Sequence, residues 1–248
     1  MWSLYDDLID SVSKDITVES AVSGRRWTML RTSDGRTGVA MTMEGAQFPS
    51  CRPESLVGTS LQEAAALVKS WNFADASFGT AALNAFYNTA ENAARLTRHI
   101  SPTAGTAQEE DAFVAYQPLV EGKKVAVIGH FPMLERSFSP ICTLSILERD
   151  PRPGDYPDSA SEFLLPEQDY VFITGCTLTN KTLPRLLQLS QNAHTILVGP
   201  STPLSPVLFF YGVNDLSGFV VKEETGCREA VERDANLFDC GKMVRILG

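Results

Sequence analysis

Three apolar strands, each ending in a glycine-containing turn, most constrain the fold of this chain. The first lies in KKVAVIGHFP at Lys123–Pro132, where an apolar, β-branched run precedes a glycine and a histidine. The same punctuation recurs at Tyr170–Asn180 and His194–Pro206. Strands that are apolar throughout are typical of a parallel sheet with both faces covered. Because ligands bind at the carboxyl edge of such sheets, the sequence predicts a loop-built site in the second half of the chain.

The first ninety residues follow a different pattern. Short strand-like segments joined by glycine turns predict an antiparallel meander over Ile16–Val22, Trp27–Arg31 and Gly38–Met43. An amphipathic helix is expected before it at Trp2–Val12, and two helices after it at Ser60–Ser70 and Ala74–Asn88. This order predicts a small α+β unit.

Strands and helices alternate in the remainder. We expect strands at Lys124–Gly129, Thr143–Glu148, Tyr170–Gly175, Thr195–Gly199 and Gly218–Val221, and helices at Met133–Phe138, Ser159–Leu164, Thr182–Ser190 and about Glu223–Phe238. Alternation of this kind predicts an α/β fold with a Rossmann-like parallel sheet and helices on both faces. Thr97–Ala107 is rich in Ser, Thr, Pro and Gly and is typical of a linker. The predicted domains are therefore 1–106 (α+β) and 107–248 (α/β).

Charge and hydropathy restrict the partners. The net charge is −9 and Lys and Arg form no dense cluster, which argues against nucleic-acid binding because phosphate neutralisation dominates that affinity. Apolar runs are far shorter than the ~20 residues of a membrane helix. The first ten residues are acidic and do not resemble a signal peptide. We therefore expect a cytoplasmic protein with no membrane partner.

Cysteines and histidines show no metal-site spacing. The five cysteines are Cys51, Cys142, Cys176, Cys227 and Cys240. Their odd number and the absence of CxxC argue against structural zinc, and a chain of this length does not require a disulfide framework. Cys176 follows a strand-terminal glycine and is either a small loop residue or a thiol facing a ligand. The three histidines form neither HxH nor HxxxH.

Gly129 and Glu148 resemble parts of a dinucleotide site. Glu148 lies nineteen positions after Gly129, where a Rossmann fold places the acid that binds ribose. The second and third glycines of the fingerprint are missing, so a sheet without a nucleotide is the alternative. His130 can act as a base or metal ligand, or it can be an ordinary hydrogen-bonded loop residue.

Polar loops follow three of the predicted strands. Asp155, on the proline-stiffened loop ERDPRPGDYP, suits a cation, amine or hydroxyl, or else belongs to a solvated turn. Two hydroxyl-rich turns could hold an anion on backbone amides or simply cap helices; their residues are Thr174, Gly175, Thr177 and Asn180, and Gly199, Ser201 and Thr202. GxxxxGK[ST] does not occur, which excludes a P-loop, and the absence of GxSxG argues against an α/β-hydrolase elbow.

Several longer motifs carry a family resemblance. GHFP, ERDPRPGDYP, ITGCTLTNKTLPRLL and VGPSTPLSPVLFFYGVNDLSG occur in this order and resemble the prokaryotic family catalogued as "putative heavy-metal chelation". The upstream stretch NFADASFGTAALNAFYN is similar to the companion amino-terminal domain of that family. The resemblance covers nearly the whole chain. It implies an enolase-type amino-terminal domain joined to a Rossmann-like domain, with a site in the cleft between them.

The resemblance also implies site positions. They are Asn84 from the first domain and Gly129, His130, Glu148, Asp155, Thr174, Thr177, Asn180, Gly199 and Ser201 from the second. From the resemblance and the loop patterns together, we assign catalytic roles to His130, for proton transfer, and to Glu148 and Asp155, for binding an amine, hydroxyl or cation. Ligand-binding roles go to Asn84, Gly129, Thr174, Gly175, Thr177, Asn180, Gly199, Ser201 and Thr202.

Three functions fit this pattern. The first is an interdomain cleft that binds a small anionic or metal-chelating ligand, in heavy-metal chelation or in metal or cofactor metabolism. The second is an enzyme that uses a nucleotide or S-adenosylmethionine-type cofactor, and the third is a non-catalytic metal or metabolite binding module. A metal ion is the candidate cofactor, although the residues do not identify it. The oligomeric state that we consider for this chain is a homodimer.

Overall fold

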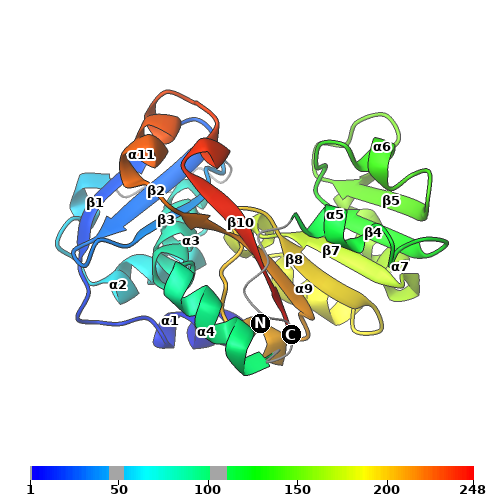
Figure 1. Ribbon diagram of the computed structural model, residues 1–248, viewed down its shortest axis with the longest axis horizontal. Coiled ribbons are helices and arrows are strands. Elements are labelled where there is room, and N and C mark those ends of the chain that lie inside the picture. Colours follow the sequence, from blue (N-terminus) through cyan, green and yellow to red (C-terminus); the bar gives the residue numbers. More distant parts are fainter. Residues whose placement is uncertain (1, 45–52, 101–110) are drawn as a thin grey trace.

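The computed structural model of the chain describes residues 2–44, 53–100 and 111–248. These residues form a three-stranded sheet and a seven-stranded sheet, each flanked by helices (Figure 1). The mixed α/β class predicted from the sequence is confirmed. Within the described ranges, no helix has the length and apolar character that crossing a membrane would require.

The small sheet is the predicted antiparallel meander. Its order is β1 (Val18–Ser23), β2 (Trp27–Thr32) and β3 (Thr37–Met41). The helices of this part are α1 (Ser3–Asp10), α2 (Leu61–Ala66), α3 (Phe73–Tyr87) and α4 (Ala90–Ile100), with 3-10 turns at Pro53–Leu56 and Leu67–Lys69. The side chain of Asn72 caps α3 by accepting the backbone N–H of Ala74, and α3 packs directly on β2 and β3.

The large sheet has the order β10-β9-β8-β7-β4-β5-β6. Its strands are β4 (Lys124–Ile128), β5 (Thr143–Glu148), β6 (Tyr156–Pro157), β7 (Tyr170–Thr174), β8 (His194–Val198), β9 (Asp215–Val221) and β10 (Gly241–Leu247). All neighbours pair in parallel except β9 and β10, which are antiparallel. The order runs outward in both directions from β4, as in a doubly wound sheet, so the topological switch point lies between β4 and β7.

Both faces of the large sheet are buried, as its apolar strands require. One face packs Val125, Val127 and Phe172 against α5 (Ala112–Tyr116) and α6 (Leu134–Ser137). The other face carries the intervening strand residues into a core shared with the small sheet and its helices. The remaining helices are α7 (Ser161–Leu164), α8 (Cys176–Thr179), α9 (Leu183–Leu189), α10 (Val207–Phe210) and α11 (Glu224–Glu232), with 3-10 turns at Asp158–Ala160, Leu165–Glu167 and Leu237–Asp239.

The carboxyl-terminal segment differs from its prediction. The helix expected to reach Phe238 ends at Glu232, and the chain then returns as β10, an edge strand absent from the prediction. A disulfide between Cys227 and Cys240 joins α11 to the start of β10. This bridge corrects the expectation that a chain of this length has no need of disulfides, because a short separation of 13 residues brings the two cysteines together on neighbouring elements.

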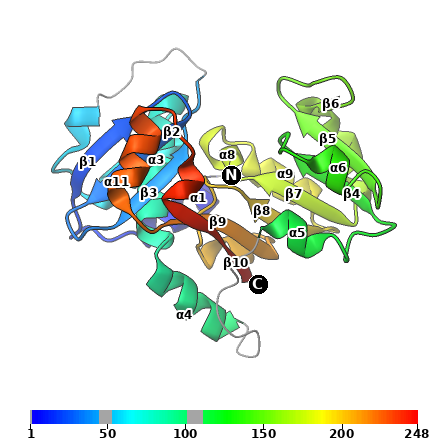
Figure 2. The ribbon, with the colours of Figure 1, turned by 45° about the horizontal axis from the view of Figure 1, so that its top comes forward.

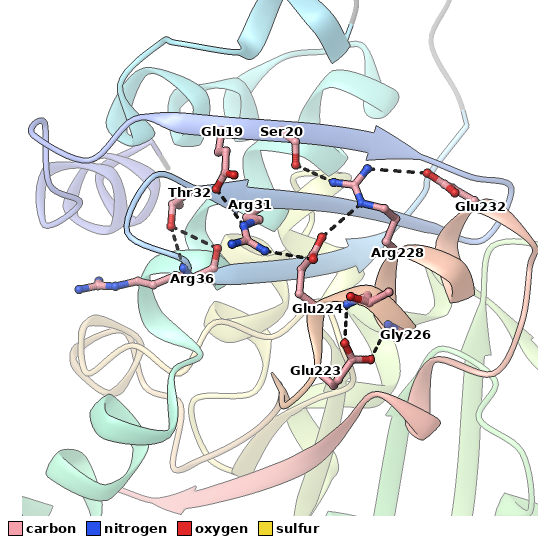
Figure 3. A network of polar contacts seen from close by, with 11 residues as sticks. Glu19, Ser20, Arg31, Thr32, Arg36, Glu223, Glu224, Gly226, Arg228 and Glu232 are labelled. Carbon is pink, nitrogen blue, oxygen red and sulfur yellow. Dashed lines mark hydrogen bonds and ion pairs between the residues drawn. The ribbon is translucent and has the colours of Figure 1, made fainter.

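Helix α11 lies on the small sheet although it belongs to the second half of the chain (Figure 2). Cys227 and Val231 of α11 pack in one apolar cluster with residues of β2 and β3, and ion pairs lie beside this contact (Figure 3). Arg31 of β2 lies between Glu19, at 2.8 Å, and Glu224 of α11, at 3.0 Å. Arg228 of α11 pairs with Glu224 and donates to Ser20 Oγ at 2.7 Å. The two halves of the sequence therefore interlock.

The predicted linker is in part helical. It was expected to begin at Thr97, but α4 continues to Ile100. Most of the rest of the linker, together with the predicted boundary at 106/107, lies outside the described residues, as does Cys51. The division into two domains therefore remains a prediction.

Candidate functional site

A cavity of about 760 Å³ lies at the carboxyl edge of the large sheet. Its walls come from the loops after β4, β5 and β7, from α7 and α9, and from Met41 and Met43 at the end of β3. The cavity thus takes lining residues from both sheets, at the switch point of the doubly wound order. This edge is where the sequence predicted a site.

Glu148 is a firmly positioned acid of the cavity. It ends β5, and its Oε2 accepts the backbone N–H of His130 at 2.9 Å while Oε1 accepts that of Arg149 at 3.1 Å. Gly129 lets the neighbouring strand approach, because its φ is +100° and a Cβ atom there would lie 3.3 Å from Thr174 Cγ2. Two fixed N–H groups leave the carboxylate further acceptor capacity for a ligand.

His130 lies between two carboxylates. Its Nδ1 is 2.9 Å from Asp155 Oδ2, and its Nε2 is 3.0 Å from Glu135 Oε1. Carboxylates only accept hydrogen bonds, so both contacts are hydrogen bonds only when both ring nitrogens carry protons. Glu135 is 61% exposed whereas the Asp155 side chain is 3% exposed. The inner contact fixes the ring, and the outer one can open to solvent.

The structure therefore brings His130, Glu148 and Asp155 together, as the sequence predicted. Asp155 is not itself a lining residue. It lies behind His130 and also accepts the backbone N–H of Arg152 at 3.0 Å. Its position is that of a residue that orients the histidine and the ERDPRPGDYP loop.

The turn after β7 contributes Thr174, Thr177 and Asn180 to the lining. The Thr177 hydroxyl donates to the Thr174 carbonyl at 2.7 Å and is therefore already used. Asn180 Oδ1 accepts from the backbone N–H and the hydroxyl of Thr182, at 3.1 and 2.6 Å. Its amide NH2 has no hydrogen-bond partner among the described residues, which leaves it as the donor of this turn.

Other predicted binding residues lie behind the wall. They are Asn84, Gly175, Gly199, Ser201 and Thr202, none of which is among the lining residues. Asn84 is fully buried and donates from Nδ2 to the carbonyls of Val39, at 2.7 Å, and Pro200, at 3.0 Å. These positions join the small sheet to the loop after β8, and a direct ligand contact by them remains a prediction.

Gly175 is required by the approach of two loops. A Cβ atom there would lie 2.5 Å from the backbone carbon of Ser201 and 2.5 Å from the backbone nitrogen of Thr202. Ser201 Oγ in turn accepts the backbone N–H of Met41 at 2.9 Å. The turn after β7, the turn after β8 and the end of β3 are consequently locked together beside the cavity.

Sequence reasoning missed the arginines and methionines of the cavity. Arg149, Arg152 and Arg185 all line it. Arg185 pairs with Glu162 at 2.9 Å, and Arg149 lies 3.6 Å from Asp158. Arg152 makes no ion pair within the described ranges, so it is the cation best able to meet a ligand. The sequence predicted a site in the ERDPRPGDYP loop that carries Arg149 and Arg152, but it assigned a ligand-binding role only to the carboxylates of this loop.

Metal ligands of the usual types do not gather at the cavity. Within the described part of the chain, no group of three or more His, Cys, Asp or Glu side chains could hold a metal ion. One thiol, that of Cys176, lines the cavity, and its Sγ lies 3.6 Å from Sδ of Met41. Burial raises the pKa of this thiol above its usual range.

Known proteins are similar to this chain in sequence and fold. Two family models, both described as "Putative heavy-metal chelation", match residues 5–87 and 111–243. A protein of unknown function from the DUF364 family of Desulfitobacterium hafniense DCB-2 has a TM-score of 0.87 and 41% identity, over 100% of this chain and 99% of that chain. Another DUF364 protein of unknown function, from Pyrococcus horikoshii, shares the fold with a TM-score of 0.77 and 21% identity, over 99% and 98% of the two chains.

An uncharacterized protein of Methanocaldococcus jannaschii is 30% identical over 196 residues, which is 73% of this chain and 69% of that protein. The resemblance drawn from the sequence motifs is thereby confirmed. The chain belongs to the DUF364 family, for which the description is "Putative heavy-metal chelation".

Proposed function

We propose that the cavity binds a small molecule carrying a hydroxyl or amine group together with carboxylates, the composition of a metal chelator. The fixed carboxylate of Glu148 carries this proposal. Glu148 is held by two backbone N–H groups and borders the cavity, so it is prepared to accept a hydrogen bond from a ligand. A preorganised acceptor of this kind loses little entropy on binding.

The anionic part of the ligand would meet Arg152, Arg149 and the Asn180 amide. A guanidinium binds a carboxylate through two parallel hydrogen bonds. This set replaces the hydroxyl donors expected from the sequence, because the Thr177 hydroxyl is used internally and Ser201 and Thr202 are buried behind the wall. His130 remains our candidate for proton transfer, and it would act when the exposed Glu135 releases Nε2.

A nucleoside-type cofactor, such as S-adenosylmethionine, is the second candidate. The strand order is doubly wound, and Glu148 ends the second strand of that unit, where ribose hydroxyls are bound. A dinucleotide fits poorly, because the helix after β4 has only four residues and provides no phosphate-binding terminus. A ribose without a pyrophosphate is compatible with the residues present, and a cofactor of this kind would supply a transferable group.

Calorimetric titration with citrate, adenosine and S-adenosylmethionine separates the two candidates. We expect citrate to bind, and Arg152→Gln and Glu148→Gln each to weaken it by about tenfold or more, since a hydrogen bond to a charged group contributes about 1.5–3 kcal/mol. Glu121→Gln, an exposed change before β4, is the matched control and leaves the affinity unchanged.

Binding of adenosine or S-adenosylmethionine that depends on Glu148 but not on Arg152 would favour the second candidate. Binding of citrate that is equal in wild type and in both cavity variants would contradict the proposed site. Chemical conversion of a bound ligand, absent in His130→Gln, would identify an enzyme rather than a binding module.

A further inference from the structure

Three sulfur-bearing side chains line the cavity where the segment after β3 approaches α8. Cys176, Met41 and Met43 all line it. The Cys176 Sγ atom is 3.6 Å from Met41 Sδ, although the two residues are 135 positions apart in the sequence. Met41 is 41% exposed and is a lining residue of the cavity. None of these sulfur atoms is needed by the organic ligand proposed above.

We propose that Cys176, Met41 and Met43 form a binding site for a single soft monovalent cation, Cu(I). Thiolate and thioether ligands select Cu(I) over hard cations. The described part of the chain has no cluster of carboxylates or imidazoles that would hold a hard or borderline ion. This inference goes beyond the proposed function and shares only the cavity with it.

The geometry suits one ion. With metal–sulfur bonds of about 2.3 Å, two sulfur atoms at the observed spacing subtend an angle of roughly 100° at the metal. Met43, two residues beyond the end of β3, lines the same cavity and would provide the third sulfur. Binding breaks the S–H bond of Cys176 and forms a sulfur–copper bond, and the proton passes to solvent. Copper stays Cu(I), so no oxidant or reductant is required.

The site is held by surrounding hydrogen bonds. Ser201 Oγ accepts the backbone N–H of Met41 at 2.9 Å and lies 3.8 Å from Cys176 Sγ. Thr174 Oγ1 lies 3.4 Å from the Cys176 backbone nitrogen and accepts its N–H. Ser201 is thus a positioning residue that contacts both sides of the sulfur cluster. This arrangement gives a buried serine at a loop junction a definite role.

Anaerobic competition with a chromogenic Cu(I) chelator tests the site with the metal alone. Wild type is expected to bind one equivalent, and Cys176→Ser to lose it. Met41→Leu and Met43→Leu should each weaken binding by more than about tenfold, because even outer-shell partners of a metal contribute 10–100-fold. Cys142→Ser is the matched control and should leave the affinity unchanged, since Cys142 is not a lining residue. We expect the same of Cys51→Ser if the site is the one proposed.

Unchanged affinity in Cys176→Ser, or in both methionine variants, would overturn the proposal. An equal loss of Cu(I) affinity in Cys142→Ser or Cys51→Ser would also overturn it, because the ion would then bind at another cysteine. Met41→Leu preserves shape at a half-exposed position, so it keeps the test decisive even if Cys176→Ser fails to fold. Because no organic ligand is present, failure here leaves the citrate titration unaffected, and the converse also holds.

Discussion

The Nδ1 atom of His130 lies 2.9 Å from Oδ2 of Asp155, and the same carboxylate accepts the backbone N–H of Arg152. One buried acid therefore fixes both the histidine of the β4 loop and the arginine of the β5 loop. The two loops come from adjacent strands, and Asp155 makes them one rigid wall of the cavity.

Removing this acid should loosen that wall. We expect Asp155→Ala to lower the free energy of unfolding by about 1–3 kcal/mol, because the N–H of Arg152 and the ring of His130 lose a charged acceptor. Asp155→Asn, which retains one acceptor oxygen, should lose less. Urea unfolding followed by circular dichroism measures both. Identical stability of wild type and Asp155→Ala would show that the contact has no structural importance.

Substitution of Asn84 should mainly lower the stability of the protein rather than its affinity for a ligand. Its amide donates to the carbonyls of Val39 and Pro200 in a fully buried position. Asn84→Ala leaves both carbonyls without a donor and should cost at least about 2 kcal/mol of unfolding free energy. Asn192→Ala, at an exposed site, is the control. A normal melting temperature combined with lost ligand binding would instead support the direct ligand contact implied by the family resemblance.

A buried polar cluster at the opposite edge of the large sheet should affect stability alone. The Tyr116 hydroxyl donates to Asp215 at 2.9 Å, and Arg245 Nε lies 2.6 Å from the same oxygen. Burial raises the pKa of Asp215 to about 6. Tyr116→Phe should lower the unfolding free energy by about 1–3 kcal/mol, whereas Tyr170→Phe should have little effect. A change in citrate affinity in Tyr116→Phe would contradict this expectation, because it would show coupling between the polar cluster and the cavity.

Lys181 should make stability depend on pH. Its ammonium donates to the carbonyls of Ser70 and Thr179 and lies 5.2 Å from the Phe73 ring centroid. Desolvation lowers its pKa to about 8, from an ordinary value of 10.5. Between these values the unfolded chain binds a proton that the folded chain has lost, so the contribution of Lys181 to stability rises with pH.

Urea unfolding at several pH values between 7.5 and 10.5 tests this sign. The difference in stability between wild type and Lys181→Met should shift in favour of wild type as the pH rises through this window. Methionine has a side chain of similar length and no β-branch, so it suits the backbone at this position, where φ is +67°. A constant difference across the window would mean that the pKa of Lys181 is not lowered in the folded protein.

Short apolar segments that end in a turn explain which strands could be predicted from the sequence. The strands β4, β5, β7 and β8 lie within one residue of their predicted bounds, because each is a short segment rich in apolar residues and closed by a turn or loop. Strand β10 escaped prediction because Lys242 and Arg245 interrupt its apolar pattern. Its place depends on pairing with β9 rather than on local sequence.

Only the site residues that directly follow strands at the carboxyl edge of the sheet could be predicted from the sequence. Gly129, His130 and Glu148 follow from strand ends and meet as expected. Ser201 and Thr202 have the same local signature, yet they are buried because another loop packs over them. The contact of Met41 with Cys176 joins distant segments, and no local pattern encodes it.

The most direct test of the cavity as a ligand site is a crystal structure of the protein grown with saturating citrate. Our account predicts citrate in the cavity, with a carboxylate on the guanidinium of Arg152 and the hydroxyl donating to Glu148. Water alone against Glu148 and Arg152 at saturating citrate, or citrate bound only elsewhere on the molecule, would contradict it.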